Sequence, residues 1–252
     1  MKRFFGMIGV ALLFASAALA QEDEEYRICT DLARRDARAG LEAALAMGGS
    51  FAALHCRAVA LVEMDRPADA AEAAELLEGL AATPRQNLTL QIELLAQAGQ
   101  AWLRADDGKR ALNVLSRAVE LRPNDPELLI DRSQVHMELT DDWGAIDDLD
   151  RALELDPKRL DALLFRAGAY YRLNVLDLAL EDADRAVTLS PRSPEARLER
   201  AAIRERQANK DGARADLMVV LQLVPDSPAA EVAREAIERL DLRQGPTAPQ
   251  RR

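Results

Sequence analysis

Apolar residues recur along the chain with a helical spacing, and the helices that they predict end at regularly placed prolines. Residues 117–123, 151–157 and 185–191 read RAVELRP, RALELDP and RAVTLSP, and residues 220–225 read VLQLVP. Their final prolines are 34 residues apart, at Pro123, Pro157, Pro191 and Pro225. Because proline lacks an amide hydrogen and restricts the residue before it, a helix ends at each of these points. The spacing therefore predicts a repeated structural unit and not a chemical site.

Four units of 34 residues, beginning at Ile92, Pro126, Leu160 and Pro194, share a pattern of small residues. Positions 8, 20 and 27 hold Gly99, Ser133, Ala167 and Ala201; Ala111, Ala145, Ala179 and Ala213; and Ala118, Ala152, Ala186 and Val220. Small side chains allow two helix backbones to cross closely. Asp, Asn and Gly residues near positions 15–18 favour a turn between the two helices. Each unit is therefore predicted to be a pair of antiparallel helices.

The period of 34, the small residues at positions 8, 20 and 27 and the proline at position 32 resemble the tetratricopeptide repeat family. The resemblance covers residues 92–225 as four tandem units, and it implies an all-α fold, a right-handed α-solenoid (a superhelix) of tandem antiparallel helix pairs. The chain departs from the family at position 4, which is usually aromatic, and in three of the four units at position 11, which is usually tyrosine. These positions hold Leu95, Leu129, Leu163 and Arg197, and Trp102, His136, Tyr170 and Arg204. The two arginines of the last unit predict loose packing there or contact with a capping helix.

The same pattern divides the rest of the chain. Residues 51–84 resemble a weaker, degenerate unit with Ala58 at position 8 and Ala70 at position 20. Residues 228–242 have the apolar spacing of one amphipathic helix, which caps an open stack end. The predicted order is a signal peptide (1–20), an N-terminal helical segment (21–50), a degenerate repeat (51–84), four repeats (92–125, 126–159, 160–193 and 194–227), a capping helix (228–242) and a disordered tail (243–252).

The N-terminal residues predict export. Lys2 and Arg3 precede an apolar run, and Ala18-Leu19-Ala20 forms a small-x-small cleavage signal before Gln21. We expect the leader to be cleaved, which would leave a chain without a membrane span, secreted across the inner membrane and located in the periplasm. The alternative is that the leader stays uncleaved as a membrane anchor. Loss of the leader takes the formal charge from −10 to −12. This acidity argues against nucleic acid and anionic lipid as partners, since both require basic patches.

Arginine at position 7 accompanies aspartate at position 23 in three units. The pairs are Arg132 with Asp148, Arg166 with Asp182, and Arg200 with Asp216, whereas the unit from Ile92 has Ala98 and Val114. Positions 7 and 23 are equidistant from the turn, so an antiparallel hairpin places them side by side. We predict three guanidinium–carboxylate pairs between the two helices. The alternative is unpaired arginine on a solvated face, and Arg57 opposite Ala73 in the degenerate unit favours that alternative.

The two cysteines predict a disulfide, because exported chains are oxidised. A bond between Cys29 and Cys56 would join the N-terminal segment to the degenerate unit. The rival interpretation is a metal site that includes His55, although three potential ligands lack a fourth. No phosphate-binding glycine loop, metal-binding helix motif or nucleophile elbow occurs in the sequence. We therefore predict that the chain is not an enzyme and has no cofactor.

In the family that the chain resembles, positions 2, 5, 9, 12 and 13 line a concave groove. The predicted partner-binding residues are Glu93, Gln100 and Arg104; Glu127, Ile130, Gln134, Met137 and Glu138; Leu164, Tyr171 and Arg172; and Arg206. The family's carboxylate-binding Lys and Asn at positions 5 and 9 are replaced here, which argues against that mode of binding.

This mixture of apolar and amide side chains suits an extended peptide or a partner helix. The leading hypothesis is an exported, non-catalytic scaffold or adaptor that binds a protein or peptide segment, in envelope assembly or secretion. The alternatives are a self-associating structural protein, which would be a homo-oligomer, and a redox or metal module that uses Cys29 and Cys56.

Overall fold

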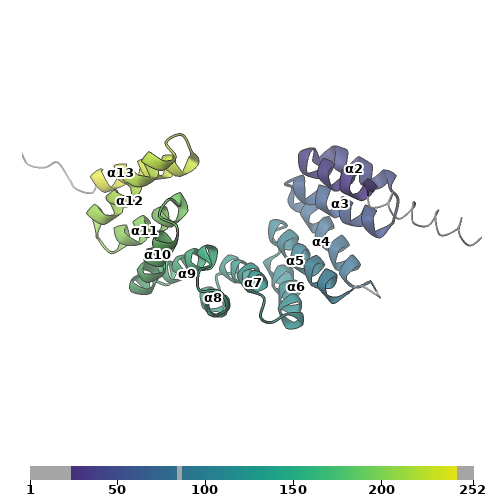
Figure 1. Ribbon diagram of the computed structural model, residues 1–252, viewed down its shortest axis with the longest axis horizontal. Helices are drawn as coiled ribbons and strands as arrows, with labels where there is room; N and C mark the ends of the chain where they lie inside the picture. The colour runs from purple at the N-terminus through teal and green to yellow at the C-terminus, as the bar shows by residue number, and fades with distance from the viewer. Residues whose placement is uncertain (1–23, 84–86, 243–252) are drawn as a thin grey trace, which may run out of the picture. The chain divides into compact units, whose positions relative to one another are not determined.

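The structure, a computed structural model, describes residues 24–83 and 87–242 as helices joined by short turns (Figure 1). The predicted signal peptide and the predicted C-terminal tail lie outside the described residues. The described residues form two compact units, which we call unit 1 (24–83 and 87–123) and unit 2 (124–242). The predicted all-α fold of tandem antiparallel helix pairs is confirmed. Among the described helices, none combines the length and the apolar composition needed to cross a membrane.

Unit 1 contains a helix at residues 24–35, followed by α2 (Ala37–Ala46), α3 (Phe51–Glu63), α4 (Pro67–Ala81), α5 (Leu88–Arg104) and α6 (Gly108–Leu121). From α2 to α6, each helix packs against the next along the chain. The N-terminal segment breaks at Asp36, whose side chain accepts hydrogen bonds from the amides of Arg38 and Ala39 and so caps α2. At that break α2 lies close against residues 24–35, because a Cβ added to Gly40 would be 2.3 Å from the Cα of Ala33.

Unit 2 contains three helix pairs and a final helix. The pairs are α7 (Pro126–Glu138) with α8 (Asp142–Leu155), α9 (Leu160–Arg172) with α10 (Leu176–Leu189), and α11 (Pro194–Arg206) with α12 (Lys210–Leu223); α13 (Pro228–Leu242) follows. Each helix packs against the next, and the first helices also contact one another, α7 with α9, α9 with α11 and α11 with α13. Pro126 and Pro194 occupy the first turn of a helix, where the missing amide hydrogen costs nothing.

The turn inside each pair contains one residue in the left-handed region. These residues are Asp65, Asp106, Thr140, Asn174 and Ala208, with φ between 53° and 63°. All five occupy position 15 of a unit. Asp107, Asp141 and Asn209 then cap the second helices by accepting hydrogen bonds from the amides of Arg110, Gly144 and Gly212. The polar turns expected from the sequence are confirmed.

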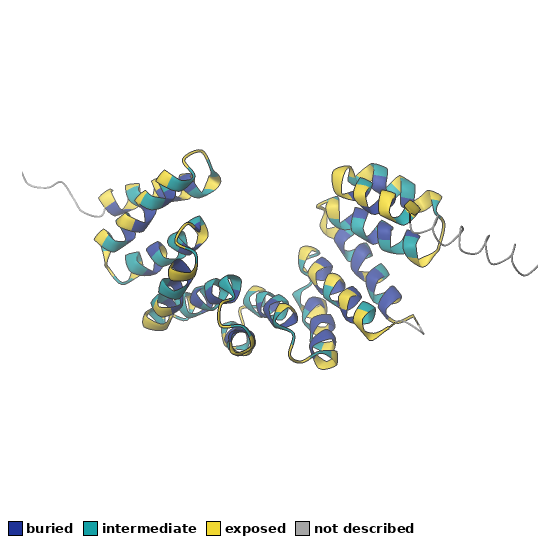
Figure 2. Cartoon of the chain, in the orientation of Figure 1, coloured by how far each residue is buried: buried dark blue, intermediate teal, exposed yellow. Residues whose placement is uncertain are grey.

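The core is formed by small residues between helices and by leucine. Ala145 and Ala179, on which the predicted helix contact depends, are both 0% exposed. Figure 2 shows the same pattern in each unit, with buried residues on the sides of the helices that face a neighbour and exposed residues on the outer sides. The close approach of the helices therefore follows from side-chain size, as the repeat pattern predicted.

Candidate functional site

In unit 2, the faces of α9 and α11 leave an open space at Gly168. A Cβ added to Gly168 would meet only one neighbouring atom within 4 Å, the Oε1 of Glu199 on α11, at 3.8 Å. Leu164 on the same helix is partly exposed, as is Tyr171 two turns later. An extended chain can therefore approach the backbone of α9 at Gly168, with apolar side chains available on either side.

Charged residues flank this opening. The guanidinium of Arg206 lies over the ring of Tyr171, 4.7 Å from its centroid. Arg172 donates a hydrogen bond from Nε to Asp142 Oδ1, at 2.7 Å. These contacts orient the two arginines, so both present guanidinium groups beside the opening in defined positions.

Glu199 is the titratable group closest to the opening. Burial raises the pKa of Glu199, while the positive charge of Arg172 lowers it. Among the described residues Glu199 has no hydrogen-bond partner, and its Oε1 faces the space above Gly168. A half-buried carboxylate without a donor can accept a hydrogen bond from a ligand amide or from a cationic group.

The predicted groove residues of α7 differ from one another in exposure. Gln134 and Met137 are partly exposed and Glu138 is exposed, as a binding surface requires. Ile130 is only 3% exposed, so its predicted role as an apolar groove contact is wrong. It lies among the packed residues of α7, which contacts both α8 and α9. Glu127 accepts two hydrogen bonds from Arg159, at 2.6 and 3.0 Å.

In unit 1, the predicted residues of α5 border a hollow. Glu93, Gln100 and Arg104 are exposed, and the last two line a cavity of about 310 Å³. The rest of its wall comes from Arg34, Glu63, Leu77 and Gln97, with Ala58, Val59, Val62 and Ala101 between them. The sequence analysis missed Arg34 and Gln97. Arg34 is five residues after Cys29, so the predicted disulfide was the one available sign that it lies near α3.

A hollow of about 400 Å³ in unit 2 lies among α8, α9 and α10, away from the predicted groove residues. Much of its charged lining is already paired. Arg166 bonds Asp150 and Asp182, and Arg185 lies 3.3 Å from Asp182. These groups stabilise the contact between helices, so the hollow adds nothing to the site at Gly168.

The three predicted arginine–aspartate pairs are confirmed. Arg132, Arg166 and Arg200 each donate two hydrogen bonds to Asp148, Asp182 and Asp216, at 2.5–2.8 Å. Two of these arginines also bond the preceding repeat, Arg166 to Asp150 at 2.6 Å and Arg200 to Asp184 at 2.9 Å. The sequence analysis missed this second bond. In the degenerate unit Arg57 pairs with Glu72, one residue before Ala73.

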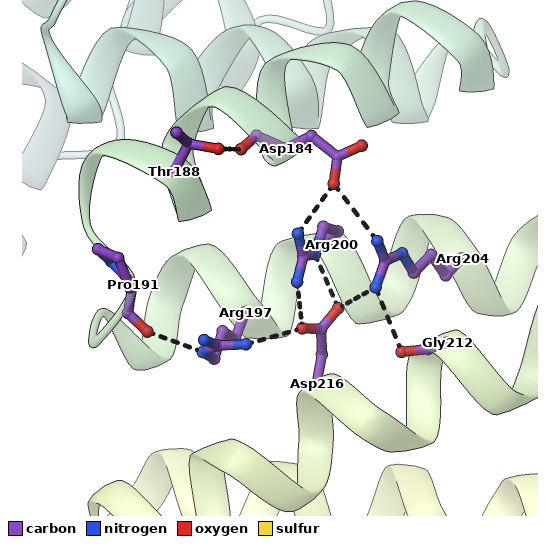
Figure 3. Close-up of polar contacts among 8 residues, drawn as sticks. All are labelled: Asp184, Thr188, Pro191, Arg197, Arg200, Arg204, Gly212 and Asp216. Atoms are coloured by element: carbon purple, nitrogen blue, oxygen red, sulfur yellow. Dashed lines mark hydrogen bonds and ion pairs between the residues drawn. The ribbon is translucent and has the colours of Figure 1, made fainter.

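The last repeat gathers three arginines around one aspartate (Figure 3). Arg197 and Arg204 bond Asp216 at 3.0 and 2.8 Å, beside the two bonds from Arg200. Of the two outcomes expected from Arg197 and Arg204, loose packing is wrong, because their guanidinium groups form ion pairs. The other outcome, contact of the last unit with a capping helix, is confirmed, because α11 and α12 both pack against α13. His136, at the same position as Arg204, donates a hydrogen bond from Nδ1 to Asp141 Oδ2 at 2.8 Å and is largely buried, in keeping with a packing role.

The predicted disulfide is confirmed between Cys29 and Cys56, whose Cα atoms are 6.1 Å apart. It joins the helix at residues 24–35 to α3. Because both sulfurs are bonded to each other, neither is available as a thiolate ligand. Within the described part of the chain, no group of three or more His, Cys, Asp and Glu side chains is placed to hold a metal ion.

Solved structures of similar fold are tetratricopeptide repeat proteins. A tetratricopeptide repeat protein from Parabacteroides merdae is 22% identical, with a TM-score of 0.62, over 75% of this chain and 74% of that one. MamA from Desulfovibrio magneticus RS-1 is 20% identical, with a TM-score of 0.57, over 68% and 97%. YrrB, described as having an unusual peptide-binding site, is 19% identical, with a TM-score of 0.52, over 68% and 93%.

No protein-family model and no curated protein matches the chain. Positions 4 and 11 are where the units differ from the family's usual residues. Leucine fills position 4 in three units, and the arginines of the last unit bond Asp216. The last unit therefore has ion pairs at two positions where the family usually has aromatic side chains.

Proposed function

We propose that this chain, which has the tetratricopeptide-repeat fold, is a non-catalytic scaffold that binds a peptide or protein segment. The opening at Gly168 carries the proposal, because it exposes helix backbone between an aromatic ring and an unpartnered carboxylate. The peptide-binding site described for YrrB, a protein of the same fold, supports it. The absence of a catalytic motif from the sequence supports a binding role over an enzymatic one.

The opening can be closed without disturbing the fold. Gly168→Leu adds bulk where no backbone stands in the way, whereas Gly168→Ala adds one carbon and serves as the matched control. Partner capture by the purified full chain from a native extract should fall about tenfold with Gly168→Leu, by the loss of roughly 1.4 kcal/mol of contact energy. Tyr171→Ala and Met137→Ala should weaken capture in the same way, with helicity unchanged.

A variant outside this face distinguishes specific binding from nonspecific adhesion. Trp143 on α8 is 59% exposed, and Trp143→Ala should leave capture unchanged. Equal capture by wild type and Gly168→Leu would refute the assignment of the site. Loss of capture with Trp143→Ala alone would instead indicate binding through exposed apolar side chains.

We propose that the protein acts after export, in envelope assembly or secretion. The basic and apolar leader with its cleavage signal before Gln21 supports this location. Cell fractionation should recover the protein in the periplasm, and N-terminal sequencing should begin at Gln21. Cytoplasmic recovery with an intact Met1 would refute it.

Self-association is a second candidate because the second helices of unit 2 expose large apolar side chains. Trp143, Leu155, Leu178, Leu189 and Met218 are between 42% and 59% exposed. Such residues are enriched where surfaces associate. Light scattering over a range of concentrations separates the candidates: a scaffold for other proteins keeps a constant mass, whereas a self-associating protein gains mass as its concentration rises.

A further inference from the structure

The hollow of unit 1 collects hydrogen-bond donors. Arg34, Gln97, Gln100 and Arg104 all line it, and its carboxylate is Glu63. The ionisable side chains of the lining therefore carry a net charge of +1, in a chain whose formal charge is −10. This local excess of positive charge favours an anionic ligand.

The two guanidinium groups are available to a ligand. Among the described residues Arg104 has neither an ion pair nor a side-chain hydrogen bond. The one carboxylate paired with Arg34 in this part of the chain is Asp31, at 3.9 Å, and both side chains are about two-thirds exposed. An ion pair of that length and exposure contributes little, so an incoming carboxylate displaces it easily. A guanidinium can then bind a carboxylate through two parallel hydrogen bonds.

A chain of hydrogen bonds orients Gln97. The Tyr26 hydroxyl lies 2.8 Å from His55 Nδ1, and His55 Nε2 lies 3.1 Å from Gln97 Oε1. Burial, together with the positive charge of Arg34, lowers the pKa of His55, although the Gln97 hydrogen bond raises it. The imidazole is therefore neutral near pH 7, accepts from Tyr26 and donates to Gln97. This occupies the acceptor of Gln97 and leaves its amide nitrogen as a donor to the hollow.

Part of the lining of the hollow is apolar. Val59 and Val62 of α3 and Leu77 of α4 contribute aliphatic side chains, and Ala58 and Ala101 are small. Within the described residues α3 and α5 approach each other less closely than α7 with α9 or α9 with α11. The hollow occupies the space that this separation leaves. It suits a carboxylate attached to an aliphatic stem or adjoining an apolar side chain.

We propose that the unit 1 hollow binds a carboxylate of a peptide segment, held by Arg34 and Arg104, with neighbouring apolar groups on Val59, Val62 and Leu77. The proposal rests on the function proposed above, in that the ligand is a peptide, and it names the chemistry recognised in unit 1. The carboxylate comes from an aspartate or glutamate side chain or from a peptide C-terminus. The disulfide holds the helix that carries Arg34 against α3 and so maintains one half of the site.

The test uses the oxidised full chain on an array of random dodecapeptides, printed once with a free C-terminal carboxylate and once with a C-terminal amide. Wild type should retain peptides enriched in Asp and Glu if side chains are recognised, or only the free-carboxylate form if the C-terminus is recognised. Arg34→Gln and Arg104→Gln should each weaken the best of these peptides by about tenfold, the loss expected for one charge-assisted hydrogen-bonded contact. Arg38 is an exposed arginine of α2 outside the hollow, so Arg38→Gln is the matched control and should leave peptide binding unchanged.

Cys29→Ser combined with Cys56→Ser releases the helix that carries Arg34, and should weaken acidic peptides about as much as Arg34→Gln does. Circular dichroism verifies that each variant is folded. Bound peptides with neither an acidic preference nor a requirement for the free C-terminal carboxylate, or equal effects of Arg38→Gln and Arg104→Gln, would overturn the proposal while leaving peptide binding intact. An array without any bound peptide would overturn both this proposal and the proposed function.

Discussion

Arg166 donates two hydrogen bonds to Asp182, from Nε to Oδ2 and from a terminal nitrogen to Oδ1, both at 2.7 Å. The two residues are 16 positions apart, on α9 and α10, and their side chains are 15% and 3% exposed. The same arginine reaches Asp150 on α8 at 2.6 Å. One guanidinium therefore joins the two helices of its own repeat to the repeat before it.

Removing either partner of this pair should lower the free energy of unfolding. Arg166→Ala leaves the buried Asp182 without its main donor and should cost about 3 kcal/mol. Asp182→Ala should cost about 2 kcal/mol, because Arg166 keeps Asp150. The double variant should cost at least about 0.5 kcal/mol less than the sum, the coupling expected of bonded neighbours. Urea denaturation of the four proteins measures these values.

The exposed pair of Arg27 and Glu24 provides a control, since their side chains are 75% and 55% exposed. Alanine at either or both positions should change the free energy of unfolding by at most about 0.5 kcal/mol. Additive losses at Arg166 and Asp182 would show that the two side chains do not pair in solution.

Gly40→Ala should destabilise unit 1 by about 1–3 kcal/mol, the usual effect of excess volume at a packed contact. The added carbon would overlap the backbone of Ala33, which cannot move as a flexible side chain would. Gly79 on α4 has no atom within 4 Å of the corresponding position. Gly79→Ala should therefore stabilise the chain by about 0.5–1 kcal/mol through helix propensity. Thermal denaturation measures the change in stability caused by each substitution. Changes in the same direction would contradict the close packing of Gly40 against Ala33.

Ala208→Gly should raise the free energy of unfolding by about 0.5–1 kcal/mol. Ala208 has φ of 63°, a conformation that costs an L-residue about 1 kcal/mol and glycine much less. Ala202, which is exposed within α11, is the matched position, and Ala202→Gly should lose about 1 kcal/mol. Urea midpoints of the two variants should move in opposite directions. A destabilised Ala208→Gly would mean that the turn is not left-handed in solution.

Stability should fall below pH 6.5 because of His55. Its folded-state pKa is lowered, chiefly by burial, so the unfolded chain binds a proton that the folded chain excludes. This contribution is present above the unfolded pKa and is lost as the pH falls toward the folded value. Urea titrations at pH 5 and 7.5 should give a smaller decline for His55→Gln than for wild type. An identical loss of stability in the two proteins would show that groups other than His55 cause the pH dependence.

The repeat pattern predicted the helix contacts because it depends on side-chain size. Ala145 and Ala179 are buried in every arrangement that lets those helices touch, so spacing alone was sufficient. The bonds from Arg166 and Arg200 to the preceding repeat could also have been predicted from the sequence. Asp150 and Asp184 share position 25 in the two units that precede these arginines, a recurrence that comparison of the units reveals.

The site could be predicted only in part because burial and proximity depend on tertiary packing. Ile130 and Leu164 occupy the same position of the repeat, yet one is buried and the other partly exposed. Arg34 lies outside the repeats, and no period relates it to Arg104. The break at Asp36 likewise depends on a helix cap competing with continued helix, which hydrophobic spacing does not register.

The aspartates at position 25, which bond the arginine of the following repeat, are absent from the last repeat before α13. This absence favours α13 as the first helix of unit 2 to unfold. Met218 stands where Asp150 and Asp184 stand in earlier repeats. Among the described residues, the ion pairs that reach α13 are those of Arg214 with Asp241 and Arg239 with Glu205; in each pair the side chain on α13 is more than half exposed, so these pairs hold the helix weakly. Fraying in unit 2 should therefore start at its C-terminal helix, and amide protons of α13 should exchange with deuterium before those of α9 and α10.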